Sequence, residues 1–408
     1  MNIFVAILGL AVLILLHEAG HFFTARAVGM SPRRFYLGFP PALVKVVRNG
    51  IEYGIGAIPL GGYVKIPGMH RPAASDLDVQ LGPALNEDPR LFPKVTRVKR
   101  ALEAGKLDGA RAALPELTQA VETANLSPAA AKAAQRGVTE LADSLSDDAY
   151  WRQGTWKRVA VIFAGPGTNI LLAILLIWAA YLIGAPGDTN RTVKSVKPTS
   201  PAAEVGLQPR DEIVAVNGKP TPDFTAISNQ IRGSNGKEIT VTVVRGGMAQ
   251  TLGPVKTIKM DGHYVLGFEP GWQTVRYGPV GAFTRSLHDT GVAAKGIITF
   301  LPRLVTGSGR KEVSSPVGIV DYSSRAVQLT FSLYLQILGL ISLSVAILNL
   351  LPLLPLDGGH ILFSLIEGAR RRAVGREVYE RVSALGIALF LVLMLIGLSN
   401  DINRLGGG

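Results

Sequence analysis

The sequence has no cysteine, and only 18% of its 408 residues are charged. The absence of cysteine excludes disulfide bonds and thiolate metal sites, so any zinc ion would need histidine and carboxylate ligands. The charged residues are also unevenly spread, since residues 159–184 and 326–356 contain none. Uncharged runs of this length are typical of membrane-spanning helices.

Four apolar stretches are long enough to cross a bilayer, which takes about 20 helical residues. Besides the two uncharged runs they are residues 3–23 and 382–398, in a chain whose mean hydropathy is +0.29. The first reaches spanning length only if residues 17–21 belong to it. No basic residue precedes it, so we expect a retained span and not a cleaved signal peptide, although residues 25–27 loosely resemble a cleavage site. The sequence therefore predicts a polytopic α-helical membrane protein with four transmembrane helices.

The net charge of +12 could indicate a nucleic-acid partner, but the basic residues gather beside the apolar runs. We interpret them as topology signals and predict no nucleic-acid binding. They follow the first span, precede the second and separate the third from the fourth, so these three segments should be cytoplasmic. Both termini and residues 187–325 are then outside. The residues concerned are Arg26, Arg33, Arg34, Lys45, Arg48, Arg152, Lys157, Arg158, Arg370, Arg371, Arg372, Arg376 and Arg381.

The first apolar run contains His17-Glu18-Ala19-Gly20-His21. Residues four apart share a helix face, so the two histidines can bind one metal ion, and Glu18 beside them can take a proton from water. A helix end whose histidines only form hydrogen bonds is the simpler alternative. Ionisable side chains within a span are costly and usually functional, which favours the metal site.

Two other spans carry polar motifs at the same predicted depth. The second span begins with a Gly- and Pro-containing segment that ends in Asn169, and the third ends after two prolines in Asp357. With the topology above, all three motifs lie near the cytoplasmic face. We therefore predict one Zn²⁺ held by two histidines and one carboxylate, with a glutamate as general base and then proton donor. The predicted site comprises the ligands His17, His21 and Asp357, the catalytic Glu18, and Asn169 and Asn349 for the substrate backbone or the oxyanion; helix packing is the alternative role of the second-span motif.

The segments between the first two spans carry a predicted hairpin and a helical insert. Asn49-Gly50 joins two strand-like runs within residues 43–66, which is a strong hairpin signal. The following Gly61, Gly62 and Tyr63 could offer a strand edge to an unfolded substrate, or the hairpin could be purely structural. Residues 70–95 show no clear period and are predicted to be loop. Residues 97–150 predict two or three amphipathic helices, as a spacer or a partner-docking unit.

The long segment after the second span changes character. Residues 188–275 alternate strand-like runs with turns and predict a soluble β-rich domain with a helix over 223–232. Residues 280–306 suit a helix lying along the outer membrane interface, with His288 on its surface.

Together these motifs resemble the site-2 protease family of intramembrane zinc metalloproteases, bacterial envelope-stress type. The resemblance rests on residues 17–21, 163–169 and 349–358. Residues 56–65 resemble the membrane-associated β-loop of that group, residues 200–218 its PDZ domain, and residues 315–319 its turn before the third span. It covers most of the chain except roughly residues 70–150.

The resemblance implies cleavage of single-pass membrane proteins within their transmembrane segments. Typical substrates are anti-sigma factors already cut outside by an upstream site-1 protease, and signal-peptide remnants, with the PDZ domain filtering out substrates whose outer domain is intact. It implies that His17, His21 and Asp357 bind zinc, that Glu18 is catalytic and that Asn349 contacts substrate. The chain departs from the family pattern in having one PDZ domain, the helical insert, and Arg210, Ser315 and Leu354 where glycine, glycine and proline are common.

The expected protein lies in a bacterial inner membrane, with the bilayer as its environment, its active site near the cytoplasmic face and an extracytoplasmic PDZ-like α+β domain. Its predicted parts are transmembrane helix 1 (1–25), a membrane-associated β-loop (26–69), a cytoplasmic helical insert (70–155), transmembrane helix 2 (156–186), the PDZ-like domain (187–275), an interfacial helix region (276–325), transmembrane helix 3 (326–358), a cytoplasmic loop (359–381), transmembrane helix 4 (382–400) and a tail (401–408).

Three other functions explain less of the sequence. A secreted zinc peptidase would need a further ligand downstream and a leader without the histidine pair. A non-catalytic membrane scaffold with a PDZ-like domain would explain residues 188–275 but not three polar motifs at one depth. A metal-coupled transporter would show repeated halves, and the sequence has no internal repeat.

Overall fold

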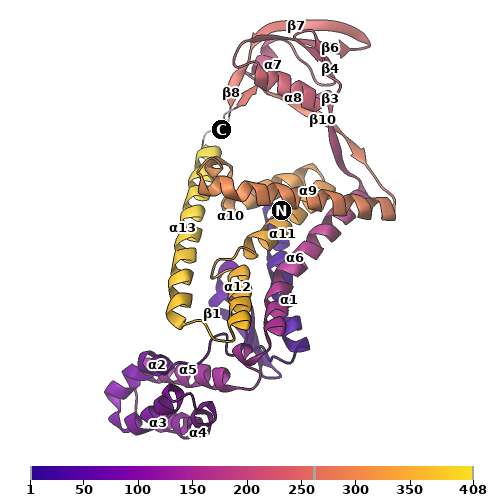
Figure 1. Ribbon diagram of the computed structural model, residues 1–408. Helices are drawn as coiled ribbons and strands as arrows, with labels where there is room; N and C mark the ends of the chain where they lie inside the picture. The colour runs from indigo at the N-terminus through magenta and orange to yellow at the C-terminus, as the bar shows by residue number, and fades with distance from the viewer. Residues whose placement is uncertain (1, 261–262, 407–408) are drawn as a thin grey trace. The chain divides into compact units, whose positions relative to one another are not determined.

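The computed structural model describes residues 2–260 and 263–406, and it divides into two compact units (Figure 1). Unit 1 comprises residues 1–177 and 286–408, and unit 2 comprises residues 178–285. Four helices of the described chain are long and apolar enough to cross a membrane, as the sequence predicted, so the chain is an integral membrane protein. These spans are α1 (Asn2–Ala27), α6 (Thr155–Ile183), α11 (Phe331–Asn349) and the segment Glu377–Arg404 of α13 (Arg376–Gly406).

The third predicted span is not one continuous helix. After α10 (Pro316–Leu329) and α11, residues 350–356 leave the helical conformation, and α12 (Asp357–Arg370) follows. Pro352 and Pro355 explain the interruption because proline cannot donate the helical hydrogen bond. Asp357 therefore begins a helix, which corrects the expectation that it ends the span at residue 358. An anion is favoured at a helix N-terminus, so this position suits the Asp357 carboxylate.

The segment before α12 packs closely on the start of that helix because two glycines follow Asp357. A Cβ at Gly358 would lie 2.2 Å from the Leu350 carbonyl oxygen, and one at Gly359 would lie 2.5 Å from the Leu354 nitrogen. The predicted cytoplasmic loop 359–381 is mostly helical, since α12 and the start of α13 cover it. The predicted tail 401–408 continues α13 to Gly406, and its last two residues lie outside the described part of the chain.

The predicted hairpin forms from β1 (Arg34–Arg48) and β2 (Ile51–Lys65). Asn49 and Gly50 have φ angles of 50° and 75°, as a tight hairpin turn requires. Both strands are bent, so residues 34–37 pair with residues 52–55 on one side and with residues 62–65 on the other. Among the described residues the segment 62–65 is therefore an edge of this sheet.

The insert between β2 and α6 is a helical unit with its own apolar core. Its helices are α2 (Ala74–Glu87), α3 (Phe92–Glu103), α4 (Leu107–Thr123) and α5 (Pro128–Leu145), with short 3₁₀ turns at Pro89–Leu91 and Tyr150–Arg152. The prediction of a loop over 70–95 was wrong, because α2 and the start of α3 lie there, whereas the prediction of two or three helices over 97–150 is confirmed by α3, α4 and α5. Leu77, Leu81 and Ala84 lie on one buried face of α2, and Pro83 within that helix obscured the period.

Unit 2 is built on a twisted antiparallel sheet. Its strand order is β10-β3-β4-β6-β7, with β5 paired to β4, while β8 and β9 form a separate ribbon. Ile213, Ile227 and Ile239 are fully buried between the sheet and α8. The elements are β3 (Ala185–Val196), α7 (Pro201–Glu204), β4 (Glu212–Val216), β5 (Lys219–Pro220), α8 (Phe224–Gly233), β6 (Glu238–Arg245), β7 (Met248–Lys256), β8 (Ile258–Met260), β9 (His263–Val265) and β10 (Phe268–Val275).

The helix predicted for residues 280–306 is α9 (Pro279–Val305), and a 3₁₀ turn at Arg310–Glu312 follows it. The buried carboxylate of Asp401 joins α13 to α10, a contact that the sequence did not predict. Asp401 of α13 is fully buried and accepts hydrogen bonds from the Ser315 nitrogen at 2.7 Å and the Gly318 nitrogen at 3.0 Å. Both donors lie at the N-terminus of α10, so Asp401 fastens the end of α13 to the start of α10.

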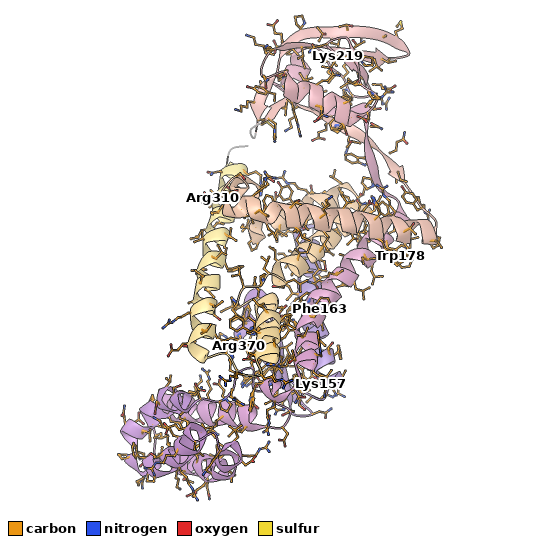
Figure 2. The ribbon with its side chains drawn as sticks, in the orientation of Figure 1. Lys157, Phe163, Trp178, Lys219, Arg310 and Arg370 are labelled. Atoms are coloured by element: carbon orange, nitrogen blue, oxygen red, sulfur yellow. The ribbon has the colours of Figure 1, made fainter. Side chains whose placement is uncertain are left out.

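Figure 2 shows how charged side chains are distributed along the spans of unit 1. Lys157 and Arg370 lie at one end of the helices, and Arg310 lies toward the opposite end. Phe163 lies between, on the apolar part of α6, and is exposed to the surroundings of the helix.

Candidate metal centre

The site is assembled from α1 and the start of α12. His17 and His21 are one turn apart on α1, and their Nε2 atoms are 3.3 Å apart. Asp357 places its Oδ2 atom 3.3 Å from His17 Nε2 and 3.5 Å from His21 Nε2. Among the described residues, His17, His21 and Asp357 are the histidine and carboxylate side chains whose ligand atoms lie close enough together to hold a metal ion.

The spacing of these three atoms fits zinc. Tetrahedral ligands at about 2.1 Å from an ion lie about 3.4 Å from one another, and the three observed separations are 3.3, 3.3 and 3.5 Å. Both histidines are buried, with exposed fractions of 7% and 6%. Two imidazoles and one carboxylate leave a fourth position for water, which is the donor set of a catalytic zinc site.

Helix α6 packs directly on the histidine pair, and small residues make this possible. A Cβ at Gly165 would lie 2.2 Å from His21 Nε2, and one at Gly20 would lie 2.5 Å from the Ala164 carbonyl oxygen. His21 Nδ1 donates a hydrogen bond to the Val161 carbonyl oxygen at 2.8 Å. This contact directs His21 Nε2 toward the other two ligand-type atoms.

Glu18 lies between the histidine pair and the sheet edge. A Cβ at Gly62 would fall 2.2 Å from Glu18 Cγ, so the Glu18 side chain packs against the β2 backbone at this edge. The Lys65 carbonyl accepts a hydrogen bond from the Arg33 nitrogen, and backbone groups of adjacent residues in a strand point in opposite directions, so those of Gly62 and Val64 point away from β1. Of the predicted docking residues, Gly62 therefore contacts the site directly, and Gly61 and Tyr63 flank it on β2.

The two predicted asparagines differ in their surroundings. Asn169 is 1% exposed and lies one turn beyond Gly165 on α6, on the helix face that carries the site. Its Oδ1 atom has no hydrogen-bond partner among the described residues, although its backbone carbonyl accepts a hydrogen bond from Ser342 Oγ at 2.8 Å. Asn349 is the last residue of α11, is half-buried, and forms no side-chain hydrogen bond with another described residue.

A buried ion pair holds α12, and with it Asp357, against α6. Arg158 donates a hydrogen bond to Glu367 at 2.6 Å, and the side chain of Arg158 is only 8% exposed. Tyr150 and Ser364 add a hydrogen bond of 3.1 Å between their oxygens. Burial raises the pKa of Tyr150 to about 12, so this phenol stays neutral. Arg158 was predicted only to mark the topology, and its pairing with Glu367 was not predicted; a glutamate at the end of the mostly apolar run 361–366 was the available clue.

Comparisons with known proteins place the chain in a family. The family model described as Peptidase family M50 matches residues 5–393. The zinc metalloprotease RasP of Bacillus licheniformis is 28% identical over 424 residues, covering 99% of this chain and 100% of that protein. The regulator of sigma-W protease RasP of Bacillus subtilis is 28% identical over 416 residues, covering 96% of each chain. Because the family model matches nearly the whole length of the chain, the chain belongs to peptidase family M50, the site-2 protease family of zinc-dependent metalloproteases.

Proposed function

We propose that this protein cleaves peptide bonds within the transmembrane segments of single-pass membrane proteins, with zinc held by His17, His21 and Asp357 and with Glu18 as the catalytic acid–base. The observation that carries the proposal is the convergence of three ligand-type atoms at 3.3–3.5 Å, two of them from the apolar helix α1 and one from the start of α12. Side chains of this kind are expensive in a membrane helix unless they serve a function.

Each residue has a defined task in this proposal. Zinc, when bound, acidifies the attacking water and polarises the scissile carbonyl. Glu18 accepts the proton of that water and returns it to the leaving amide nitrogen. The Val161 carbonyl keeps His21 in the tautomer that leaves Nε2 free. Asn169 and Asn349 are proposed to hold the substrate backbone or the developing oxyanion. The unsatisfied Oδ1 of Asn169 supports the first of these roles, because it can accept a hydrogen bond from a substrate N–H.

We also propose that the substrate is held as an added strand. A helix must unwind before its backbone can reach a protease site, and an unwound segment has free N–H and C=O groups. The edge formed by Gly61, Gly62 and Tyr63 lies against Glu18 and presents complementary groups. Bulk at residue 62 is excluded by the Glu18 side chain, which explains a glycine there.

The relatives suggest the substrates. Because one relative is named a regulator of sigma-W protease, we propose anti-sigma factors as substrates, after a first cut by a site-1 protease, with signal-peptide remnants as a second class. Basic residues at the α6 and α12 ends, including Lys157 and Arg370, favour a cytoplasmic location for that end of the helices. The proposed setting is therefore a bacterial inner membrane with the site near the cytoplasmic face.

Unit 2 is proposed to be the extracytoplasmic PDZ-like filter. Its antiparallel sheet with two helices suits such a domain, and Arg210, where PDZ domains usually have glycine, adopts a φ of 76°. That conformation is one that glycine adopts readily and other residues rarely do, which explains the usual glycine. A purely non-catalytic scaffold would use unit 2 but would give no reason for the histidine–aspartate cluster.

Co-expression with a single-pass anti-sigma factor tests the proposal. Glu18→Gln should abolish cleavage and retain about one zinc per chain, because it removes the proton carrier and keeps the ligands. His21→Ala should lose both zinc and cleavage. His288→Ala is the matched control, since this exposed histidine of α9 lies outside the metal centre and should change neither. Cleavage by Glu18→Gln at the wild-type rate would refute the catalytic assignment.

A further inference from the structure

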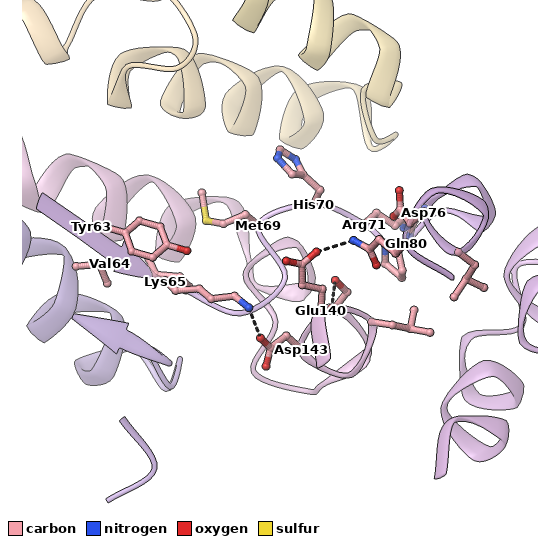
Figure 3. Close-up of a pocket in the computed structure, with 15 residues that line it drawn as sticks. Tyr63, Val64, Lys65, Met69, His70, Arg71, Asp76, Gln80, Glu140 and Asp143 are labelled. Atoms are coloured by element: carbon pink, nitrogen blue, oxygen red, sulfur yellow. Dashed lines mark hydrogen bonds and ion pairs between the residues drawn. The ribbon is translucent and has the colours of Figure 1, made fainter. Parts of the chain in front are cut away.

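We propose that the helical insert gives this protease a pocket that recognises a basic side chain of the substrate. This side chain belongs to the cytoplasmic segment that directly adjoins the transmembrane part of the substrate. This inference rests on the proposed function above. A cavity of about 350 Å³ separates the end of β2 from the insert helices α2 and α5 (Figure 3). Its walls include Tyr63 and Lys65 from β2, Gln80 from α2, and Glu140 from α5.

The cavity continues the substrate edge beyond the metal centre. Gly62 contacts Glu18, while Lys65, on the same edge segment, lines the cavity. A strand advances about 3.3 Å per residue, so these two positions are about 10 Å apart along it. A substrate strand paired with this edge would therefore reach the cavity three to four residues from the point opposite Gly62.

The insert is fixed to the sheet in a way that preserves this arrangement. Asp143 of α5 forms ion pairs with Arg33 Nε at 2.9 Å and with Lys65 Nζ at 3.1 Å. The backbone of the insert end also bonds to the segment after β2, with the Tyr150 nitrogen donating to the Pro67 carbonyl oxygen at 2.8 Å. The cavity is thus a junction between two anchored parts of unit 1.

Asp76, Glu140 and Asp143 line the cavity, and Glu140 differs from Asp143 in having no ion pair with a described residue. Lys65 is bound to Asp143, and the Arg71 guanidinium lies over the Trp151 ring at 4.8 Å. Glu140 accepts a hydrogen bond from Gln80 Nε2 at 2.6 Å and forms no ion pair with any residue that the structure describes. Figure 3 shows both contacts, Lys65 with Asp143 and Gln80 with Glu140. Glu140 is half-buried, so an incoming cation would be partly shielded from water.

The chemistry of membrane proteins indicates what occupies the cavity. Cytoplasmic segments next to a span are enriched in lysine and arginine, in any single-pass protein that obeys the positive-inside rule. A cationic side chain three to four residues from the cleavage point would meet Glu140, with the Tyr63 ring as a further favourable surface. The insert would thus check that a candidate segment carries a basic flank on the correct side.

Exchange of charge between enzyme and substrate tests this pocket. Two single-pass model substrates would differ only in carrying three lysines or three glutamates next to the cytoplasmic end of the span. Binding would be measured by fluorescence anisotropy on full-length, zinc-loaded protein with Glu18→Gln, so that it does not depend on cleavage. Glu140→Lys should weaken binding of the lysine substrate about threefold to tenfold and strengthen binding of the glutamate substrate. Glu140→Gln should give an intermediate result.

Glu122→Lys is the matched control, because Glu122 is an exposed residue of α4 that forms no ion pair with a described residue and lies outside the cavity. It makes the same change in net charge and should leave the ratio of the two affinities unchanged. An unchanged ratio in Glu140→Lys, or an equal change in Glu122→Lys, would overturn the pocket. If the wild type binds the lysine substrate selectively and cleaves neither substrate, the proposed function fails while the pocket stands.

Discussion

Replacing Gly165 by alanine should remove zinc from the protein without unfolding it. A Cβ at this position would lie 2.2 Å from His21 Nε2 and 2.8 Å from His17 Nε2, whereas ordinary contacts are 3.4–4 Å. Relief of the closer contact requires a displacement of about 1.2 Å, from 3.4 minus 2.2. Metal–ligand distances tolerate only about 0.2 Å, so the histidine pair could not keep its geometry. We expect zinc affinity to fall at least about 10–100-fold and cleavage about 100-fold.

Gly167→Ala is the control on the same helix. The nearest atom to a Cβ there is Phe163 Cε1 at 3.2 Å, which is part of a movable ring. Alanine is also the better helix former, so this variant should keep its zinc and melt no lower than the wild type.

The measurement is zinc content after equilibration with a graded series of chelator concentrations, followed by thermal unfolding in detergent. Gly165→Ala should unfold like the chelator-treated wild type, which separates metal loss from helix disruption. Wild-type zinc retention in Gly165→Ala would show that α6 does not press on the histidine pair, and would refute the packing derived for the site.

Two further predictions concern other parts of the chain. Asp401→Ala should destabilise the full-length protein by about 3 kcal/mol, measured as unfolding in detergent, because it leaves the backbone donors of Ser315 and Gly318 buried without an acceptor; an unchanged melting temperature would contradict the anchoring role. In unit 2, burial alone would raise the pKa of Asp211, but the two hydrogen bonds from Arg245 at 2.7 Å hold it below its ordinary value. The stabilisation by the Asp211–Arg245 pair is complete above about pH 4 and is lost as the pH falls through the pKa of Asp211 in the folded protein. The melting temperature should therefore fall on acidification in the wild type, and it should fall less in Asp211→Asn.

Local patterns were sufficient to predict many separate elements of the structure. The four predicted apolar helices form, because backbone N–H and C=O groups in lipid must find hydrogen-bond partners within the chain and a helix supplies them. The Asn49-Gly50 turn joins its strands for an equally local reason, since these residues accept positive φ angles. The helix predicted over 223–232 forms as α8, with Asp223 capping it through a hydrogen bond from the Ala226 nitrogen at 2.7 Å.

Predictions failed where a local signal was ambiguous. Pro83 made the segment 70–95 look like a loop, although the apolar face of α2 packs into the insert core and outweighs the proline. Residues 326–358 were predicted to form one transmembrane helix, but the helix breaks after Asn349 and the chain resumes as a new helix at Asp357. That resumption depends on Gly358 and Gly359 fitting against the preceding turn, which is a packing property and not a propensity.

The sequence by itself determined that this chain is a membrane protein and that its histidine pair shares one helix face, because span length and helical spacing are properties of neighbouring residues. Only the tertiary structure decided that Asp357 comes within 3.5 Å of those histidines, that Gly165 packs against them, and that a cavity between β2 and the insert includes Glu140. These contacts join residues separated by tens or hundreds of positions, and they depend on how helices and strands pack, which no local pattern records.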